Sequence, residues 1–278
     1  KDFKYQYANV TSAGSWRTAN SANTARASGV SAGTGSSSVA FGGFSNPPPV
    51  RHAQTESYNG TNWTEVNDLG TARNALGGAG ADNTSALAFG GYAPPGNQGI
   101  TESWNGSNWT EVNDLTTARA NLSGSGIATA ALGFGGYVSD YSALTESWNG
   151  TNWTEVNDLN DARAYLGGAG ETNTEALAFG GDSPGNTANT ESWNGTNWTE
   201  VNNLNTARNG GAYGSTGSYT ACLYIGGNSG SVQAIVEQWN GTNWTEVADL
   251  SAAKEEMMAS GTTSSAIAAF GRNPSTSY

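Results

Sequence analysis

The chain has 278 residues, of which only 12% are charged, and its formal net charge at pH 7 is −12. This negative charge argues against duplex DNA or an anionic membrane surface as a partner, and no apolar run approaches the roughly twenty residues that a membrane-spanning helix needs. A single histidine and a single cysteine leave too few ligands of the usual types for a zinc or copper site. We therefore expect no nucleic acid, no membrane insertion, no metal and no cofactor.

The chain opens with a degenerate stretch, KDFKYQYANVTSAGSWRT, which we interpret as an imperfect β-hairpin ending near Trp16. Better copies of this hairpin follow at regular intervals, with the form TESWNGTNWTEVNDL. These copies are Thr55–Leu69, Thr101–Leu115, Thr145–Leu159, Thr190–Leu204 and Val236–Leu250. Each has two short strands, rich in aromatic and β-branched residues, on either side of an Asn-Gly turn signal.

The register of this hairpin has two solutions. A four-residue loop would set the two tryptophans opposite each other, but it would also place Glu102 opposite Glu111, which is unfavourable. A two-residue Asn-Gly turn avoids that repulsion. We therefore predict the two-residue turn.

Two further stretches stand between successive hairpins. The first carries an arginine, as in TARNALGGAG (Thr71–Gly80), and the second is an apolar strand that ends in Gly-Gly, as in SALAFGG (Ser85–Gly91). Both have the length of short strands. The repeated unit is thus four strands: the arginine strand, the Gly-Gly strand and the two hairpin strands.

The period of the unit lies in the mid-forties. The tryptophans of the second hairpin strand are Trp16, Trp63, Trp109, Trp153, Trp198 and Trp244, spaced by 47, 46, 44, 45 and 46 residues. Four strands per period of this length are typical of a β-propeller blade. We predict an all-β, six-bladed propeller in which residues 1–278 are one domain of six repeats of about 46 residues. Its closing blade would combine Lys1–Asn20 with Ala253–Arg272, which removes unpaired sheet edges.

The Gly-Gly that ends one strand, the aromatic residue in the next and the tryptophan in the last resemble the kelch repeat over nearly all of the chain. The phrase ESWNGTNWTEVNDL, with TARNALGGAG and ALAFGG, is also similar to the Gly/Asn-rich kelch-like repeats of marine bacteriophage proteins. The kelch resemblance implies that the arginine strand is innermost and the Trp63-type strand outermost. The first unit and Gly271–Arg272 depart from the pattern.

Loops of a four-stranded meander alternate between two faces. The Asn-Gly turns and short loops such as Gly80–Thr84 share one nearly uniform face, while the loops after Gly-Gly share the other face and differ from blade to blade. Variable loops on a constant scaffold are candidates for ligand contacts, although the same variation is expected where nothing constrains a loop. Tyr92, Tyr137 and Tyr141 in these loops would offer stacking surfaces for sugars.

Six basic residues share one register near the start of the innermost strand and would form a ring at the mouth of the channel. They are Arg26, Arg73, Arg119, Arg163, Arg208 and Lys254. One interpretation is a site for an anionic or polar ligand. The alternative, which we favour, is that each arginine pairs with a repeated acid such as Glu102 or Asp114, because the acids recur with the same period. Lys254 is the expected exception.

We expect no catalytic residues, since the carboxylates repeat whereas a catalytic pair is one unique site. The favoured function is a non-enzymatic binding or structural module on a virion or another extracellular surface, attaching to a host glycan, a host protein or other virion proteins. The alternatives are a polysaccharide lyase or hydrolase that uses the channel, and a repeat protein without an evolved ligand. Arg51 and His52, in the longest loop, are the one unusual pair and are added to the candidate ligand-binding residues.

Overall fold

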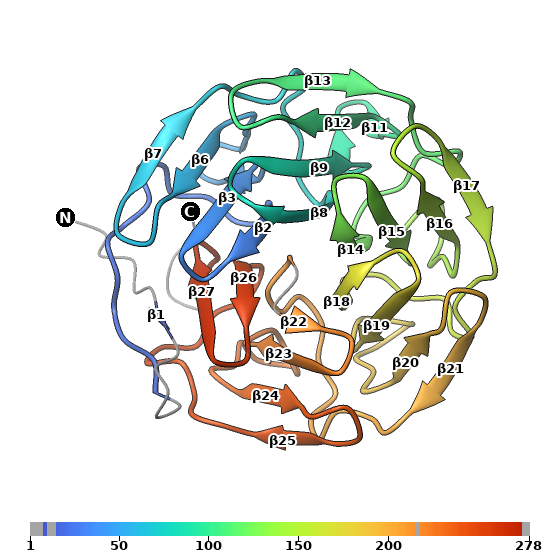
Figure 1. The fold of residues 1–278 in the computed structure, drawn as a ribbon. Coiled ribbons are helices and arrows are strands. Elements are labelled where there is room, and N and C mark those ends of the chain that lie inside the picture. Colours follow the sequence, from blue (N-terminus) through green and yellow to red (C-terminus); the bar gives the residue numbers. More distant parts are fainter. Residues whose placement is uncertain (1–7, 10–14, 215–216, 274–278) are drawn as a thin grey trace.

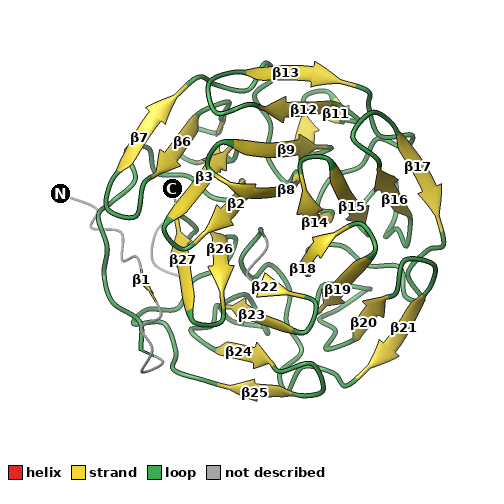
Figure 2. Ribbon diagram, viewed as in Figure 1, coloured by secondary structure: helices red, strands yellow, loops and turns green. Residues whose placement is uncertain are grey.

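The computed structural model describes residues 8–9, 15–214 and 217–273. All of its regular elements are β-strands, and these residues contain no helix (Figure 2). The sheets stand around one central axis, so the molecule is a β-propeller (Figure 1).

Five blades are four-stranded antiparallel sheets whose strands follow one another from the axis to the rim. The first has β2 (Val30–Thr34), β3 (Ser37–Phe41), β6 (Thr55–Tyr58) and β7 (Trp63–Val66); the second has β8 (Gly77–Asp82), β9 (Ser85–Phe89), β12 (Thr101–Trp104) and β13 (Trp109–Val112). The third has β14 (Ser123–Ile127), β15 (Ala130–Phe134), β16 (Thr145–Trp148) and β17 (Trp153–Val156); the fourth has β18 (Gly167–Thr172), β19 (Glu175–Phe179), β20 (Thr190–Trp193) and β21 (Trp198–Val201). The fifth has β22 (Gly217–Ser218), β23 (Ala221–Ile225), β24 (Val236–Trp239) and β25 (Trp244–Glu246). The predicted strand order is confirmed, although each arginine lies just before the innermost strand and not within it.

The prediction of six four-stranded blades is wrong, because the structure has five. Between the fifth and first blades lies a three-stranded sheet of β26 (Met258–Thr262), β27 (Ser265–Ala269) and β1 (Ala8–Asn9) (Figure 1). The N-terminal stretch was expected to supply two outer strands, but among the described residues it supplies only the two-residue β1. Residues 1–7 and 10–14 of that stretch lie outside the described part of the chain.

Trp16, expected to mark an outer strand, lies in no strand. Its indole Nε1 instead donates a hydrogen bond to the carbonyl oxygen of Ala248 in the fifth blade, at 2.8 Å.

The hairpin turns follow the four-residue register, so our prediction of a two-residue turn is wrong. Trp104 pairs with Trp109, and Glu102 lies opposite Glu111. The side-chain oxygen of Asn105 accepts the backbone N–H groups of both Ser107 and Asn108, at 3.0 and 2.9 Å, which stabilises the longer loop. The repulsion between the glutamates is offset because Glu102 turns inward to an arginine, while Glu111 stays exposed.

Neighbouring blades contact each other through the outer tryptophans. The indole of Trp153 packs 4.8 Å from the ring of Phe89 in the preceding blade, and its Nε1 donates to Thr101 Oγ1 at 3.0 Å. The same pair of contacts recurs around the molecule, and Trp63 closes the circle by packing 5.4 Å from Phe270 beside β27. These tryptophans are the main apolar contact between blades.

The innermost strands are rich in glycine because they approach one another closely. A Cβ atom at Gly124 would lie 2.6 Å from the carbonyl oxygen of Gly78 in the adjacent blade, so only glycine fits there.

In the fifth blade, Tyr213 occupies the register of Gly78, and the chain there leaves its own sheet. It forms parallel bridges from Tyr213 to Met258 and from Gly214 to Ser31. The buried Tyr213 ring belongs to one apolar cluster with Val30 and Leu76 of other blades.

Short hairpins lie on the variable face of the first two blades. They are β4 (Phe44–Ser45) with β5 (Val50–Arg51), and β10 (Tyr92–Ala93) with β11 (Gly96–Asn97). The residue after each Gly-Gly pairs with the residue after the repeated basic residue, as in the bridge between Asn74 and Tyr92. The loops after Gly-Gly therefore lie at the same end of the channel as the basic register, as the alternation of loops predicted.

Candidate ligand pocket at one mouth of the channel

The five arginines of the basic register form ion pairs with glutamates of their own blades, as the periodic acids predicted. The pairs are Arg26–Glu56, Arg73–Glu102, Arg119–Glu146, Arg163–Glu191 and Arg208–Glu237. Every one of these arginine side chains is fully buried. A ligand at the mouth of the channel would have to displace a glutamate to reach them.

The surroundings of Arg119 show what such a pair does. Its Nε donates to the carbonyl oxygen of Gly135 at 3.1 Å and its Nη2 to that of Gly133 at 3.2 Å, while Nη1 contacts Glu146. Glu146 also accepts the backbone N–H of Thr116 at 2.7 Å. The pair therefore ties the blade-to-blade link to the second and third strands of the blade.

In two members of the basic register, Arg163 and Lys254, burial shifts the pKa of the side chain. Burial lowers the pKa of Arg163, although Glu191 lies 2.9 Å from its Nη1 and favours the charged form. Lys254 is partly exposed, and burial lowers the pKa of its ammonium group. Its closing sheet includes no Asn-Gly hairpin, and hence no hairpin glutamate, among the described residues.

Two residues beyond each basic residue, the backbone forms a closed ring of hydrogen bonds around the axis. The N–H of each ring residue donates to the carbonyl oxygen of the ring residue in the preceding repeat, at 2.7–3.1 Å. The six ring residues are Ser28, Ala75, Asn121, Tyr165, Gly210 and Glu256, and their φ angles all lie between 53° and 57°. This left-handed conformation costs an ordinary residue about 1–2 kcal/mol, so the ring is maintained at a cost in five of six positions.

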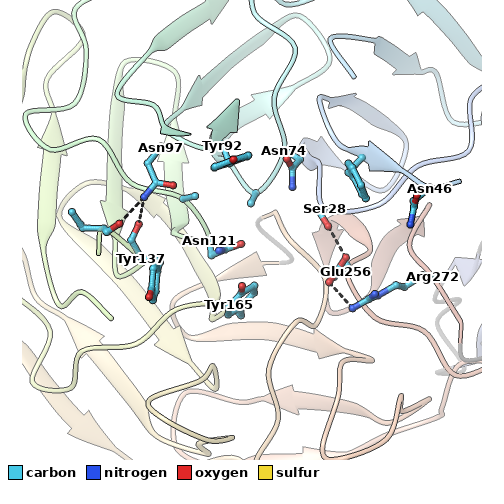
Figure 3. Close-up of a pocket in the computed structure, with 14 residues that line it drawn as sticks. Ser28, Asn46, Asn74, Tyr92, Asn97, Asn121, Tyr137, Tyr165, Glu256 and Arg272 are labelled. Carbon is cyan, nitrogen blue, oxygen red and sulfur yellow. Dashed lines mark hydrogen bonds and ion pairs between the residues drawn. The ribbon is translucent and has the colours of Figure 1, made fainter. Parts of the chain in front are cut away.

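The ring lies at the base of an open pocket of about 490 Å³ (Figure 3). Five of the six ring residues contribute to its lining, and Gly210 contributes to an adjoining cavity of about 380 Å³. The first volume falls within the range of about 300–1,000 Å³ common for small-molecule sites.

The two sides of the pocket differ in chemistry. On one side, the residues after Gly-Gly are aromatic: Phe44, Tyr92 and Tyr137. On the other side, Arg272 takes the equivalent position and contacts both Glu255 and Glu256 at 2.7 and 2.9 Å. Aromatic rings thus line the pocket at the first three blades, and the ion-paired Arg272 lines it at the closing sheet.

Polar groups of the pocket are partly held by one another. Glu256 accepts the hydroxyl of Ser28 at 2.6 Å and the Nη2 of Arg272 (Figure 3). Asn97 donates to the carbonyl oxygens of Tyr137 and Val138 at 2.8 and 3.0 Å.

Asn74 also lines the pocket. Its buried Oδ1 has no hydrogen-bond partner within the described residues. A donor group on a ligand would satisfy this oxygen.

The other candidate residues lie at or beneath the aromatic rings of the pocket. The guanidinium of Arg51 lies 4.7 Å from the centre of the Tyr92 ring and 5.5 Å from that of Phe44. Tyr141 packs edge-on against Tyr137, and its hydroxyl donates to Asp182 at 2.8 Å, which raises the Tyr141 pKa to about 12. Arg51 and Tyr141 therefore support the two tyrosines that line the pocket.

His52 does not reach the pocket lining. Its Nε2 lies 2.8 Å from Ser45 Oγ and its Nδ1 lies 2.8 Å from Gln54 Oε1. Burial lowers the pKa of the imidazole, partly opposed by the Gln54 hydrogen bond, and Arg26 lowers it further. The geometry thus fixes a neutral histidine in the scaffold.

The sequence pattern pointed to the tyrosines but not to the ring residues, Asn74 or Arg272. A signal for the ring was present, since the second residue after the basic residue differs in every repeat.

Other chemistry is sparse in the part of the chain that the structure describes. No three side chains of His, Cys, Asp or Glu gather there to hold a metal ion, and no helix there is long and apolar enough to cross a membrane. Cys222 is buried, and this burial raises the pKa of its thiol.

Comparisons of the chain with models of protein families and with curated proteins gave no match.

Proposed function

We propose that this protein is a non-enzymatic binding propeller that holds a carbohydrate in the pocket on its variable face. The observation that carries the proposal is the presence of aromatic rings and hydrogen-bonding groups in one pocket. Sugars have apolar C–H faces that stack on aromatic rings and hydroxyl groups that need polar partners. Tyr92 and Tyr137 supply the first, and Asn74, Asn121 and Glu256 supply the second.

We further propose that the blades are of the kelch type and that the protein belongs to a virion or another extracellular surface. The second strand of a blade ends in Gly-Gly, and aromatic residues follow in the third and fourth strands, as in kelch repeats. The likeness of the repeated phrase to bacteriophage repeats supports the location. Capsid or tail genes beside the coding sequence would support it independently.

A glycan array followed by calorimetry with the best glycan tests the binding function. We expect saturable 1:1 binding that Tyr137→Ala weakens at least tenfold, while Tyr137→Phe, which keeps the ring, changes it by less than threefold. A parallel pull-down from host extract tests a protein partner. Absence of glycan binding together with capture of a protein, or with turnover of polysaccharides that His52→Ala abolishes, would refute the proposal.

A further inference from the structure

We infer that the six ring residues form an exchangeable recognition set, in which the side chain at each position selects the ligand and contributes little to the fold. This inference rests on the proposed function, since it concerns selectivity in the same pocket. It adds the particular residues that decide which carbohydrate is held.

The backbone of the ring does not depend on the side chains that it carries. Each ring residue is fixed by one donated and one accepted backbone hydrogen bond. The side chains of Ser28 and Glu256 add a hydrogen bond between two neighbouring ring positions, at 2.6 Å. The same φ angle, within 4°, is kept by serine, alanine, asparagine, tyrosine, glycine and glutamate. The ring therefore holds its geometry whatever the side chain.

The ring position varies more than the buried basic position two residues before it. Within the same stretch, the basic residue is arginine in five repeats, and each of those arginines is buried in an ion pair. Two residues later, no residue type occurs twice. The basic position, which holds the ion pair, is thus nearly constant, whereas the ring position differs in every repeat.

The ring side chains make the pocket asymmetric. Tyr165 contributes an aromatic side chain to the pocket, Asn121 an amide and Glu256 a carboxylate (Figure 3). Ala75 contributes no polar side-chain group. A pocket lined by five different ring residues has no rotational symmetry. It fits one asymmetric molecule, such as a single mono- or disaccharide unit, and not a symmetric ligand centred on the axis.

Gly210 offers the sharpest test. A Cβ atom there would meet only Glu256 Cγ, at 3.9 Å, and the left-handed φ of 57° is one that asparagine tolerates. Gly210→Asn therefore adds an amide to the adjoining cavity without a clash. At Gly181, by contrast, φ is 109° and a Cβ atom would lie 2.8 Å from the carbonyl oxygen of Ala164, so Gly181→Asn is a matched control for damage to the fold.

The experiment measures melting temperature and binding for Gly210→Asn, Tyr165→Gly and Gly181→Asn. The probes are lactose, maltose, cellobiose and N,N′-diacetylchitobiose, each titrated by calorimetry. We expect the two ring variants to melt within about 2 °C of the wild type and to change the ratio of affinities between at least two disaccharides by tenfold or more. Gly181→Asn should melt clearly lower.

The outcomes distinguish failure of the inference about the ring from failure of the proposed function. If the wild type binds a disaccharide and the ring variants keep the same order of affinities, the inference is wrong while the proposed function stands. If the ring variants melt as low as Gly181→Asn, the ring side chains determine the fold and the inference is also wrong. If the wild type binds none of these probes or the glycans of the array, the proposed function fails, and selection by the ring fails with it.

Discussion

Replacing Arg119 by alanine should destabilise the protein strongly. The change removes a fully buried guanidinium that donates to three backbone carbonyls, those of Thr117, Gly133 and Gly135, and contacts Glu146. Glu146 keeps its hydrogen bonds from Thr116 but loses its opposite charge in a buried site. Breaking one partner of a buried pair costs about 3–5 kcal/mol, and the three carbonyls left without the donor place this case towards the upper end.

Lys254→Ala is the matched comparison in the same register. Lys254 is only partly buried, its pKa is lowered by that burial, and its sheet has no hairpin glutamate in the described residues. Removing it should cost less than about 1 kcal/mol. Arg119→Lys should fall between the two, because lysine keeps the charge but lacks the planar fork that contacts several acceptors.

Urea unfolding at pH 7, followed by tryptophan fluorescence, gives the free energies if the transitions are two-state. Equal and small losses for Arg119→Ala and Lys254→Ala, both below about 1 kcal/mol, would refute the structural role of the ion pairs. Such a result would make the arginines ligand-binding candidates again.

Three further predictions concern the scaffold. Trp198→Ala should lower the free energy of unfolding by about 3–5 kcal/mol and Trp198→Phe by clearly less, measured by urea unfolding; equal losses would contradict packing as the cause. His52 has a folded-state pKa below its ordinary value, so its contribution to stability is present above about pH 6.5 and is lost as the pH falls below it. The melting temperature should therefore drop between pH 7.5 and 5.5, and less so in His52→Gln; identical pH profiles would exclude His52 as the source. Gly124→Ala should cost about 1–3 kcal/mol through overpacking, whereas Gly96→Ala, with nothing within 4 Å of the added Cβ, should be nearly neutral in the same unfolding assay.

Much of the blade could be predicted because every copy of the repeat supports the same interpretation. The arginine–glutamate pairs followed from the shared period of acids and bases, and the tryptophan contacts from their fixed register. The turn could not be predicted by counting charges on the hairpin alone. Its four-residue loop depends on the Asn105 side chain and on Arg73, which holds Glu102 from a distant part of the sequence.

The closing sheet and the pocket were harder to predict for a different reason. The closing blade required the degenerate N-terminal stretch to form two strands, yet its one described strand is the two-residue β1. The pocket depends on a left-handed backbone that usually reveals itself through glycine or asparagine. In this propeller the ring of hydrogen bonds imposes that conformation on Ala75, Tyr165 and Glu256 as well. The residue types at these positions therefore did not indicate a left-handed backbone.

The tryptophan junctions have a consequence for how parts of this molecule would associate. At the junctions among the first five blades, a phenylalanine of one blade contacts a tryptophan of the next, as in Phe134 with Trp198, whereas the fifth blade has Ile225 in the phenylalanine register. Such head-to-tail contacts form either a closed ring or an open filament, depending only on whether the rotation closes. A fragment of two or three blades would expose one surface of each kind. It should therefore recruit a complementary fragment or copies of itself, and the intact ring avoids polymerisation by satisfying its last junction, Trp63 with Phe270, internally.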